Sequence, residues 1–121
     1  MSHEAQDIFS LEFARYIAAG LATHPQWRAL ALSNLDNWER RNADAPQLLR
    51  CYREWRELLA LPEAEFIAQL LAQTDRGQEI RQGTPFAGIM TAREVWAVKR
   101  RIREELSQRA SQSADEQRGA A

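Results

Sequence analysis

Residues 44–59 of the chain read DAPQLLRCYREWRELL, and the spacing of apolar side chains within this stretch decides the fold class. The larger apolar side chains recur at intervals of three and four, which places them on one face of an α-helix. They are Leu48, Tyr52, Trp55 and Leu59. Asp44 and Pro46 precede the run, and a polar cap with proline in the first turn is typical of a helix start. The stretch therefore predicts an amphipathic helix.

The same period continues through most of the chain, and no convincing alternation of apolar and polar residues indicates a strand. The expected helices cover about residues 7–21, 25–41, 46–60, 62–71, 75–80 and 91–108. Short connections between them favour neighbouring helices that pack roughly antiparallel. We therefore predict an all-α protein, a compact bundle of about five to six short helices that forms a single domain over residues 1–108.

Polar residues at the ends of these segments predict helix caps. Thr23 to Gln26 and Thr91 to Glu94 both have the spacing of a capping box, in which the threonine hydroxyl and the residue three positions later bond each other's backbone amides. Thr74 is expected to cap the fifth helix, and Gly83 is expected to end it in the left-handed conformation.

The C-terminal residues 109–121 differ in composition from the rest of the chain. They are Ser, Gln, Ala, Gly and charged residues, with no apolar side chain larger than alanine. Such a segment buries too little apolar surface to offset the entropy of ordering, so we predict a disordered tail.

The net charge, the cysteine count and the lack of long apolar runs argue against several classes of protein. Sixteen basic and seventeen acidic side chains give a net charge of −1, which argues against a protein dedicated to coating nucleic acid. The one cysteine, Cys51, excludes an internal disulfide and is typical of the reducing cytosol. No signal peptide and no apolar run long enough to cross a membrane is visible, so a cytoplasmic protein is expected.

No pattern in the sequence indicates catalysis, a metal or a cofactor. His3 and His24 are the only histidines, and neither has a second ligand at helical spacing, so His24 is expected at a helix cap or on the surface. Cys51 has no base near it in sequence and is expected to be a small core residue. The glycine pair in residues 83–88 lacks the lysine of a phosphate-binding loop. We therefore expect a protein that is not an enzyme.

Residues 81–89, RQGTPFAGI, form the one segment that reads as an ordered loop without helix. Two interpretations of this loop stay open. In the first, Phe86 plugs the bundle while glycines supply the difficult backbone angles. In the second, the loop faces a partner, with Pro85 holding it rigid and Arg81, Gln82 and Phe86 making the contacts.

The last helix has a broad basic side opposite its apolar face. Lys99 and Arg103 lie one turn apart, Arg100 lies next to them, and Trp96 lies off the main apolar stripe. This side is either a solvated helix face or a contact surface for an acidic protein or a phosphate backbone. Trp96 either widens the core contact or anchors a partner, since Trp and Arg are favoured at interface hot spots.

Several of these features resemble a group of small bacterial all-helical proteins. The resemblance covers about residues 34–103 and rests on the tryptophans Trp38 and Trp55, on the loop pattern Arg-Gln-x-x-Pro-Phe-Ala-Gly at residues 81–88, and on Glu94. This chain has Val95 where arginine is common in the group. The resemblance implies a compact helical protein of bacterial type and supplies no catalytic residue.

The sequence therefore favours a non-enzymatic protein-binding module, such as the antitoxin-like or accessory partner of a bacterial two-component pair. The candidate contact residues are Arg81, Gln82, Pro85, Phe86, Trp96, Lys99, Arg100 and Arg103. The alternative is a nucleic-acid-binding protein that uses the last helix, which requires Lys99, Arg100 and Arg103 exposed on one face without an acidic screen. Another protein is the expected partner, and a homo-oligomer also fits.

Overall fold

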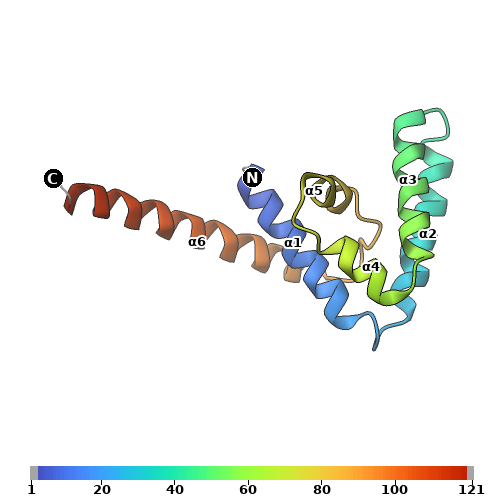
Figure 1. Cartoon of the computed structure of the whole chain (residues 1–121), viewed down its shortest axis with the longest axis horizontal. Helices are drawn as coiled ribbons and strands as arrows, with labels where there is room; N and C mark the ends of the chain where they lie inside the picture. Colours follow the sequence, from blue (N-terminus) through green and yellow to red (C-terminus); the bar gives the residue numbers. More distant parts are fainter. Residues whose placement is uncertain (1–2, 120–121) are drawn as a thin grey trace. The chain divides into compact units, whose positions relative to one another are not determined.

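The structure, a computed structural model, describes residues 3–119 and contains six α-helices within that range (Figure 1). They are α1 (His3–Gly20), α2 (Gln26–Arg41), α3 (Pro46–Leu59), α4 (Glu63–Leu70), α5 (Asp75–Gln82) and α6 (Ala92–Gly119). Between residues 3 and 119 there is no β-strand. The predicted all-α helical bundle of about six helices is confirmed.

The backbone groups into two compact units. One unit is formed by Ser10–Ile89, and the other combines Met1–Phe9 with Met90–Ala121, so that the start of α1 belongs with α6. A compact unit of this kind is not necessarily an independently folding domain, so the single domain predicted for residues 1–108 stays a prediction.

The core of the Ser10–Ile89 unit is built by helices that follow one another in the sequence. Helix α2 packs against α3, α3 against α4, and α4 against α5; Figure 1 shows α2 and α3 lying side by side. Ten large apolar side chains at helical spacing are buried: Phe13, Ile17, Leu21, Trp27, Leu35, Tyr52, Trp55, Leu59, Phe66 and Leu70. The spacing of apolar residues therefore identified the face that each of these helices buries.

A double ion pair joins α2 to α3 at the edge of this core. The guanidinium of Arg56 donates from Nε to Glu39 at 2.7 Å and from Nη2 to Asp36 at 2.5 Å. These two hydrogen bonds raise the pKa of Arg56 above its ordinary value. Because the planar fork of arginine contacts two carboxylates one turn apart, it fixes the register of α3 along α2.

The loop after α5 fills the centre of the unit. The Phe86 side chain is fully buried, with its ring edge-on to Trp55 at 6.3 Å and tilted against Phe66 at 6.2 Å. The side-chain amide of Asn34 donates to the carbonyl oxygens of Pro85 at 2.8 Å and of Ala87 at 3.0 Å. The loop is therefore part of the core. Of the two interpretations left open by the sequence, the structure supports the one in which Phe86 plugs the bundle.

Glycine is required at two places in this unit. Gly88 has φ of +105°, a left-handed angle that other residues rarely adopt, and it turns the chain directly after the plug. Gly77 is buried at the start of α5, where the backbone of Ala72 approaches closely. Gly83, expected to be left-handed, instead has φ of −101°, because the turn that needs the positive angle lies five residues later.

Substitution of Gly77 tests the close approach of α5 to the end of α4. A Cβ atom at Gly77 would collide with the carbonyl oxygen of Ala72, so Gly77→Ala forces the backbone to move. We expect it to lower the free energy of unfolding by about 2 kcal/mol, the cost of overpacking a rigid site. Gly83→Ala is the control, since its Cβ would meet nothing closer than 3.9 Å. Equal urea midpoints for the two variants would contradict the close packing.

The predicted caps form at two of four places. The polar cap predicted at Asp44 is absent, because α3 begins after Ala45 and has no side-chain cap hydrogen bond. Thr74 Oγ1 accepts from the backbone amide of Gly77 at 3.0 Å. Thr91 and Glu94 bond each other's backbone amides, both at 3.1 Å, as a capping box. The box predicted at Thr23 is absent, because the Thr23 hydroxyl donates to the carbonyl of Gly20 and thereby ends α1 instead of starting α2.

The C-terminal segment differs from the predicted disordered tail over residues 109–119. These residues continue α6 to Gly119, with nearly every side chain exposed. The reason is local: Ala, Gln, Glu and Arg are good helix formers, and an established helix extends through them without core contacts. As predicted, residues 109–119 bury no large apolar side chain. Residues 120 and 121 of the predicted tail lie outside the described residues.

Candidate functional site

The loop residues proposed as partner contacts divide into buried and exposed positions. Arg81 is 4% exposed, and Pro85 and Phe86 are fully buried, so burial removes these three from any contact surface. The reason is that Phe86 completes the core while Arg81 bonds the backbone at the end of α4. Gln82 is exposed.

Gln82 borders an open groove of about 530 Å³ within the Ser10–Ile89 unit. The groove is lined by the C-terminal end of α2, by the first turns of α3 and by the backbone after α5: Trp38, Arg41, Asn42, Leu48, Tyr52, Gln82, Gly83 and Thr84. Leu48 is 43% exposed, although the sequence placed it on the buried stripe of its helix. A large aliphatic side chain at this exposure, beside two aromatic rings, marks the groove as a candidate contact site.

The aromatic wall of the groove is held in place by contacts between α2 and α3. The rings of Trp38 and Tyr52 lie 5.8 Å apart at a tilt of 45°. The side-chain amide of Asn42 donates to the Tyr52 hydroxyl at 3.0 Å and to the backbone carbonyl of Trp38 at 3.1 Å. These contacts pre-form the groove, so binding there requires little ordering of its wall.

The charged group at the groove is Arg41. Its side chain is exposed near the end of α2, and no carboxylate in residues 3–119 forms an ion pair with it. By contrast, the neighbouring Arg56 is occupied by two carboxylates. The groove therefore combines an apolar and aromatic surface with a guanidinium that is available to an acidic group.

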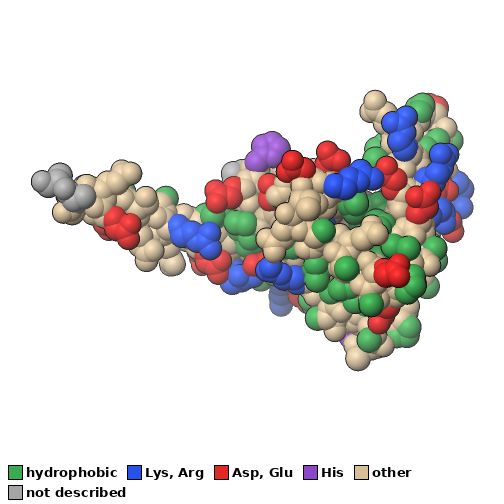
Figure 2. Space-filling model, viewed as in Figure 1, with side chains coloured by type: hydrophobic (Ala, Val, Ile, Leu, Met, Phe, Trp, Pro, Cys, Tyr) green, Lys and Arg blue, Asp and Glu red, His purple; other side chains and the backbone are tan. Residues whose placement is uncertain are grey.

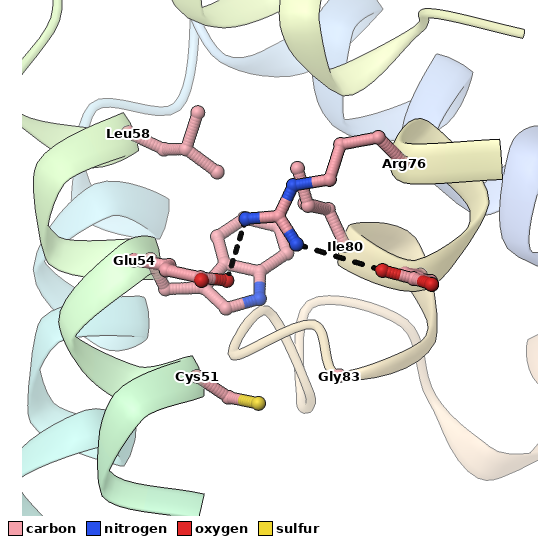
Figure 3. Close-up of a pocket in the computed structure, with 8 residues that line it drawn as sticks. Cys51, Glu54, Leu58, Arg76, Ile80 and Gly83 are labelled. Atoms are coloured by element: carbon pink, nitrogen blue, oxygen red, sulfur yellow. Dashed lines mark ion pairs between the residues drawn. The ribbon is translucent and has the colours of Figure 1, made fainter. Parts of the chain in front are cut away.

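A smaller cavity of about 100 Å³ adjoins the groove and shares Gly83 with it. Figure 3 shows Cys51, Glu54 and Leu58 on α3 facing the α5 side chains Arg76 and Ile80. Arg76 bridges the two helices with ion pairs to Glu54 at 2.8 Å and to Glu79 at 3.5 Å. The side-chain hydrogen bond to Glu54 raises the pKa of Arg76 above its ordinary value.

A third cavity of about 280 Å³ continues along the same helices toward Leu61 and shares Glu54, Leu58, Arg76 and Ile80 with the second. Together the three cavities follow the junction of α3 and α5. Cys51 is exposed at this junction and not in the core, because it lies on the flank of α3 that faces the open cavity. The sequence interpretation of Cys51 as a core residue is therefore wrong.

The predicted residues of α6 lie in the other unit and are brought together along one helix. Trp96 is 55% exposed, and the guanidinium of Arg100 lies 5.3 Å from the centre of its ring. Lys99 is half-buried, with its ammonium 5.0 Å from the Phe9 ring, and Arg103 is exposed. Trp96 is therefore a surface residue, with a cation over one side of its ring.

Acidic residues accompany the basic ones on this helix. Arg100 pairs with Glu104 and Arg101 pairs with Glu105, both at 3.1 Å, and Figure 2 shows acidic and basic side chains interspersed along α6. The nucleic-acid interpretation requires Lys99, Arg100 and Arg103 free of acidic neighbours. The structure does not meet that requirement, since Arg100 is paired and Lys99 is half-buried.

The described part of the chain also bears on metal sites, on His24 and on membrane-spanning helices. Within residues 3–119, no three His, Cys, Asp or Glu side chains gather as metal ligands. His24 is exposed, stacks on Trp27 at 4.4 Å and bonds the carbonyl of Gly20 at 2.9 Å, so the predicted helix-end role is confirmed. None of the described helices is long and apolar enough to span a membrane.

The sequence analysis did not identify Trp38, Tyr52 and Leu48 as groove residues. Their helical spacing placed all three side chains on the buried faces of their helices. The available signal was Leu48 in the first turn after Pro46, since the ends of a helix are less covered than its middle.

Comparison of the chain with family models, with curated proteins and with solved structures finds no match.

Proposed function

We propose that this chain is a non-enzymatic protein-binding module that takes a segment of a partner protein into the groove beside Trp38, Tyr52 and Leu48. In this proposal it acts as the accessory or antitoxin-like member of a bacterial two-component pair. The observation that carries the proposal is the groove itself, which is apolar, aromatic and already formed. Pre-formed apolar clefts with a few polar groups are the usual binding sites of proteins.

The chemistry of the groove defines the kind of segment that fits. An aliphatic or aromatic side chain of the partner would bury the exposed part of Leu48 and contact the rings of Trp38 and Tyr52. A carboxylate next to that side chain would pair with Arg41, which no described residue occupies. Gln82, Gly83 and Thr84 form the opposite side of the groove. The partner segment is therefore apolar and acidic.

The volume of the groove limits how much of a partner protein it can hold. About 530 Å³ accommodates a few side chains and not a whole protein surface. Because Asn42 already holds the aromatic wall residues, most of the contact energy is available for binding. An affinity in the micromolar range, about −8 kcal/mol, is reasonable for such a segment.

A peptide library displayed on phage tests the proposal with purified chain as the bait. We expect enriched peptides that combine a large apolar residue with Asp or Glu one to four positions away. Leu48→Asp removes the apolar contact and repels the acid, so it should weaken binding of a selected peptide at least about tenfold by calorimetry. Arg41→Glu should weaken it by a similar factor.

Two matched variants control for nonspecific effects of charge. Leu32→Asp changes a leucine of comparable exposure, 37%, that does not line the groove, and Arg53→Glu reverses an exposed arginine on α3. Both should bind the selected peptide as the unchanged chain does. The proposal fails if the library yields no binding peptide, or if Leu48→Asp and Leu32→Asp bind equally well.

A further inference from the structure

The two halves of α6 carry opposite charge. Residues 93–103 contain five basic side chains and one acidic one, for a net charge of +4. Residues 104–118 contain four acidic side chains and two basic ones, for a net charge of −2. A helix with this distribution is complementary to a second copy of itself that runs in the opposite direction.

The exposed side of α6 contains an apolar anchor in its basic half. Ile102 is buried and Val95, Val98 and Leu106 are half-buried, so these four define the covered side of the helix. Trp96 lies about a third of a turn away from that side and is 55% exposed. Its large apolar ring is the kind of residue that anchors interfaces.

The position of Trp96 fixes the register of such a pair. Ala114 follows Trp96 by eighteen residues, which is five turns of helix, so both lie on the same line along α6. Antiparallel pairing centred near residue 105 brings Trp96 of each copy against Ala114 of the other, where the small side chain leaves room for the indole. The same register brings Arg93 of each copy near Asp115 of the other.

The C-terminal turns of α6 are also unsupported within one chain. From residue 107 to residue 119 the helix is almost fully exposed and has no apolar side chain larger than alanine. Isolated helices of this length are marginally stable in water. A second copy along the same line would cover these turns with the Trp96 ring and would supply opposite charges at both ends.

We propose that the chain forms a two-fold symmetric dimer in which two α6 helices pair antiparallel through Trp96, Arg93 and Asp115. The occupant of this helix face is thus a second copy of the chain. The symmetry of the contact repeats each interaction twice, which is the usual arrangement of soluble homodimers. The dimer does not depend on the groove proposed above, since all of its contacts lie on α6.

Sedimentation equilibrium of the full chain tests the dimer. We expect a concentration-dependent monomer–dimer equilibrium that Trp96→Ala weakens at least about tenfold. Gln112→Ala, on a different side of the same exposed helix, is the control and should leave the association constant unchanged. Circular dichroism of each variant checks that α6 is still formed.

Charge reversal tests the antiparallel register. Arg93→Glu alone and Asp115→Arg alone should each weaken association about fivefold, because each places two like charges together twice. The double variant Arg93→Glu/Asp115→Arg should recover most of the loss, and an equimolar mixture of the two single variants should form heterodimers. Neither residue has an ion pair within residues 3–119 that the reversal would break.

The dimer proposal is overturned if the chain stays monomeric at the highest concentrations. It is also overturned if the double variant associates no more tightly than the single variants do. Measurement of peptide binding to the Trp96→Ala variant separates failure of the dimer proposal from failure of the proposed function. If the dimer is absent and selected peptides still bind, only the dimer proposal fails. If the dimer forms and no peptide binds, only the groove proposal fails.

Discussion

Phe86→Ala should lower the free energy of unfolding by about 4 kcal/mol, the largest effect expected of any single substitution outside the helices. The ring is fully buried between Trp55 and Phe66, and its removal leaves a cavity that the surrounding rings cannot fill. The loop cannot collapse into the space, because Asn34 holds the carbonyls on both sides of the residue. Urea denaturation followed by tryptophan fluorescence measures the change.

Phe86→Leu provides the graded comparison for this effect. It retains part of the volume and should cost roughly 1 to 2 kcal/mol, well below the alanine variant. Leu32→Ala, at an exposed position, should change stability by less than about 0.5 kcal/mol. If Phe86→Ala were as stable as the unchanged chain and lost binding of a partner, the loop would be a contact surface and not a core plug.

Arg81→Met should destabilise the chain by about 3 kcal/mol for a different physical reason. Arg81 Nη1 donates to the backbone carbonyls of Leu70 at 3.0 Å and Ala72 at 2.7 Å, the groups left over where α4 ends. Methionine fills similar space and supplies no donor, so these carbonyls lose their partner at a buried site. Thermal and urea unfolding give two independent measures of the loss.

Arg81→Lys separates charge from geometry in the same site. A lysine ammonium keeps the charge and lacks the planar fork, so the variant should lie between Arg81→Met and the unchanged chain. Arg53→Met removes an exposed arginine from α3 and should be close to neutral. Matching stabilities of Arg81→Met and Arg53→Met would show that the bonds to Leu70 and Ala72 contribute little.

The sequence predicts the helices well because each helix buries one continuous stripe. Tyr52, Trp55 and Leu59 illustrate this, since their spacing alone identifies the buried face of α3. Thr91 and Glu94 illustrate the caps, whose bonds are local and depend on neighbouring residues only. Local interactions are those that a sequence pattern can represent.

Contacts between distant residues are what the pattern does not represent. Arg81 resembles a surface residue by type, and its burial depends on the carbonyls at the end of α4, nine and eleven residues earlier. Asn34 bonds the loop across more than fifty residues. The groove arises in the same way, because Leu48 and Gln82 lie far apart in the sequence and line it together only in the folded chain.

The bonds from Arg81 to the end of α4 have a mechanical consequence for the groove and its adjoining cavities. Helices α4 and α5 are joined by a buried guanidinium and by the close approach of Gly77 to Ala72, so they move together as one stiff wall. Across the cavity, α3 is tied to α5 by the solvent-accessible bridge from Arg76 to Glu54. Widening of this junction therefore requires the rupture of this surface ion pair together with a shift of α3 against α4.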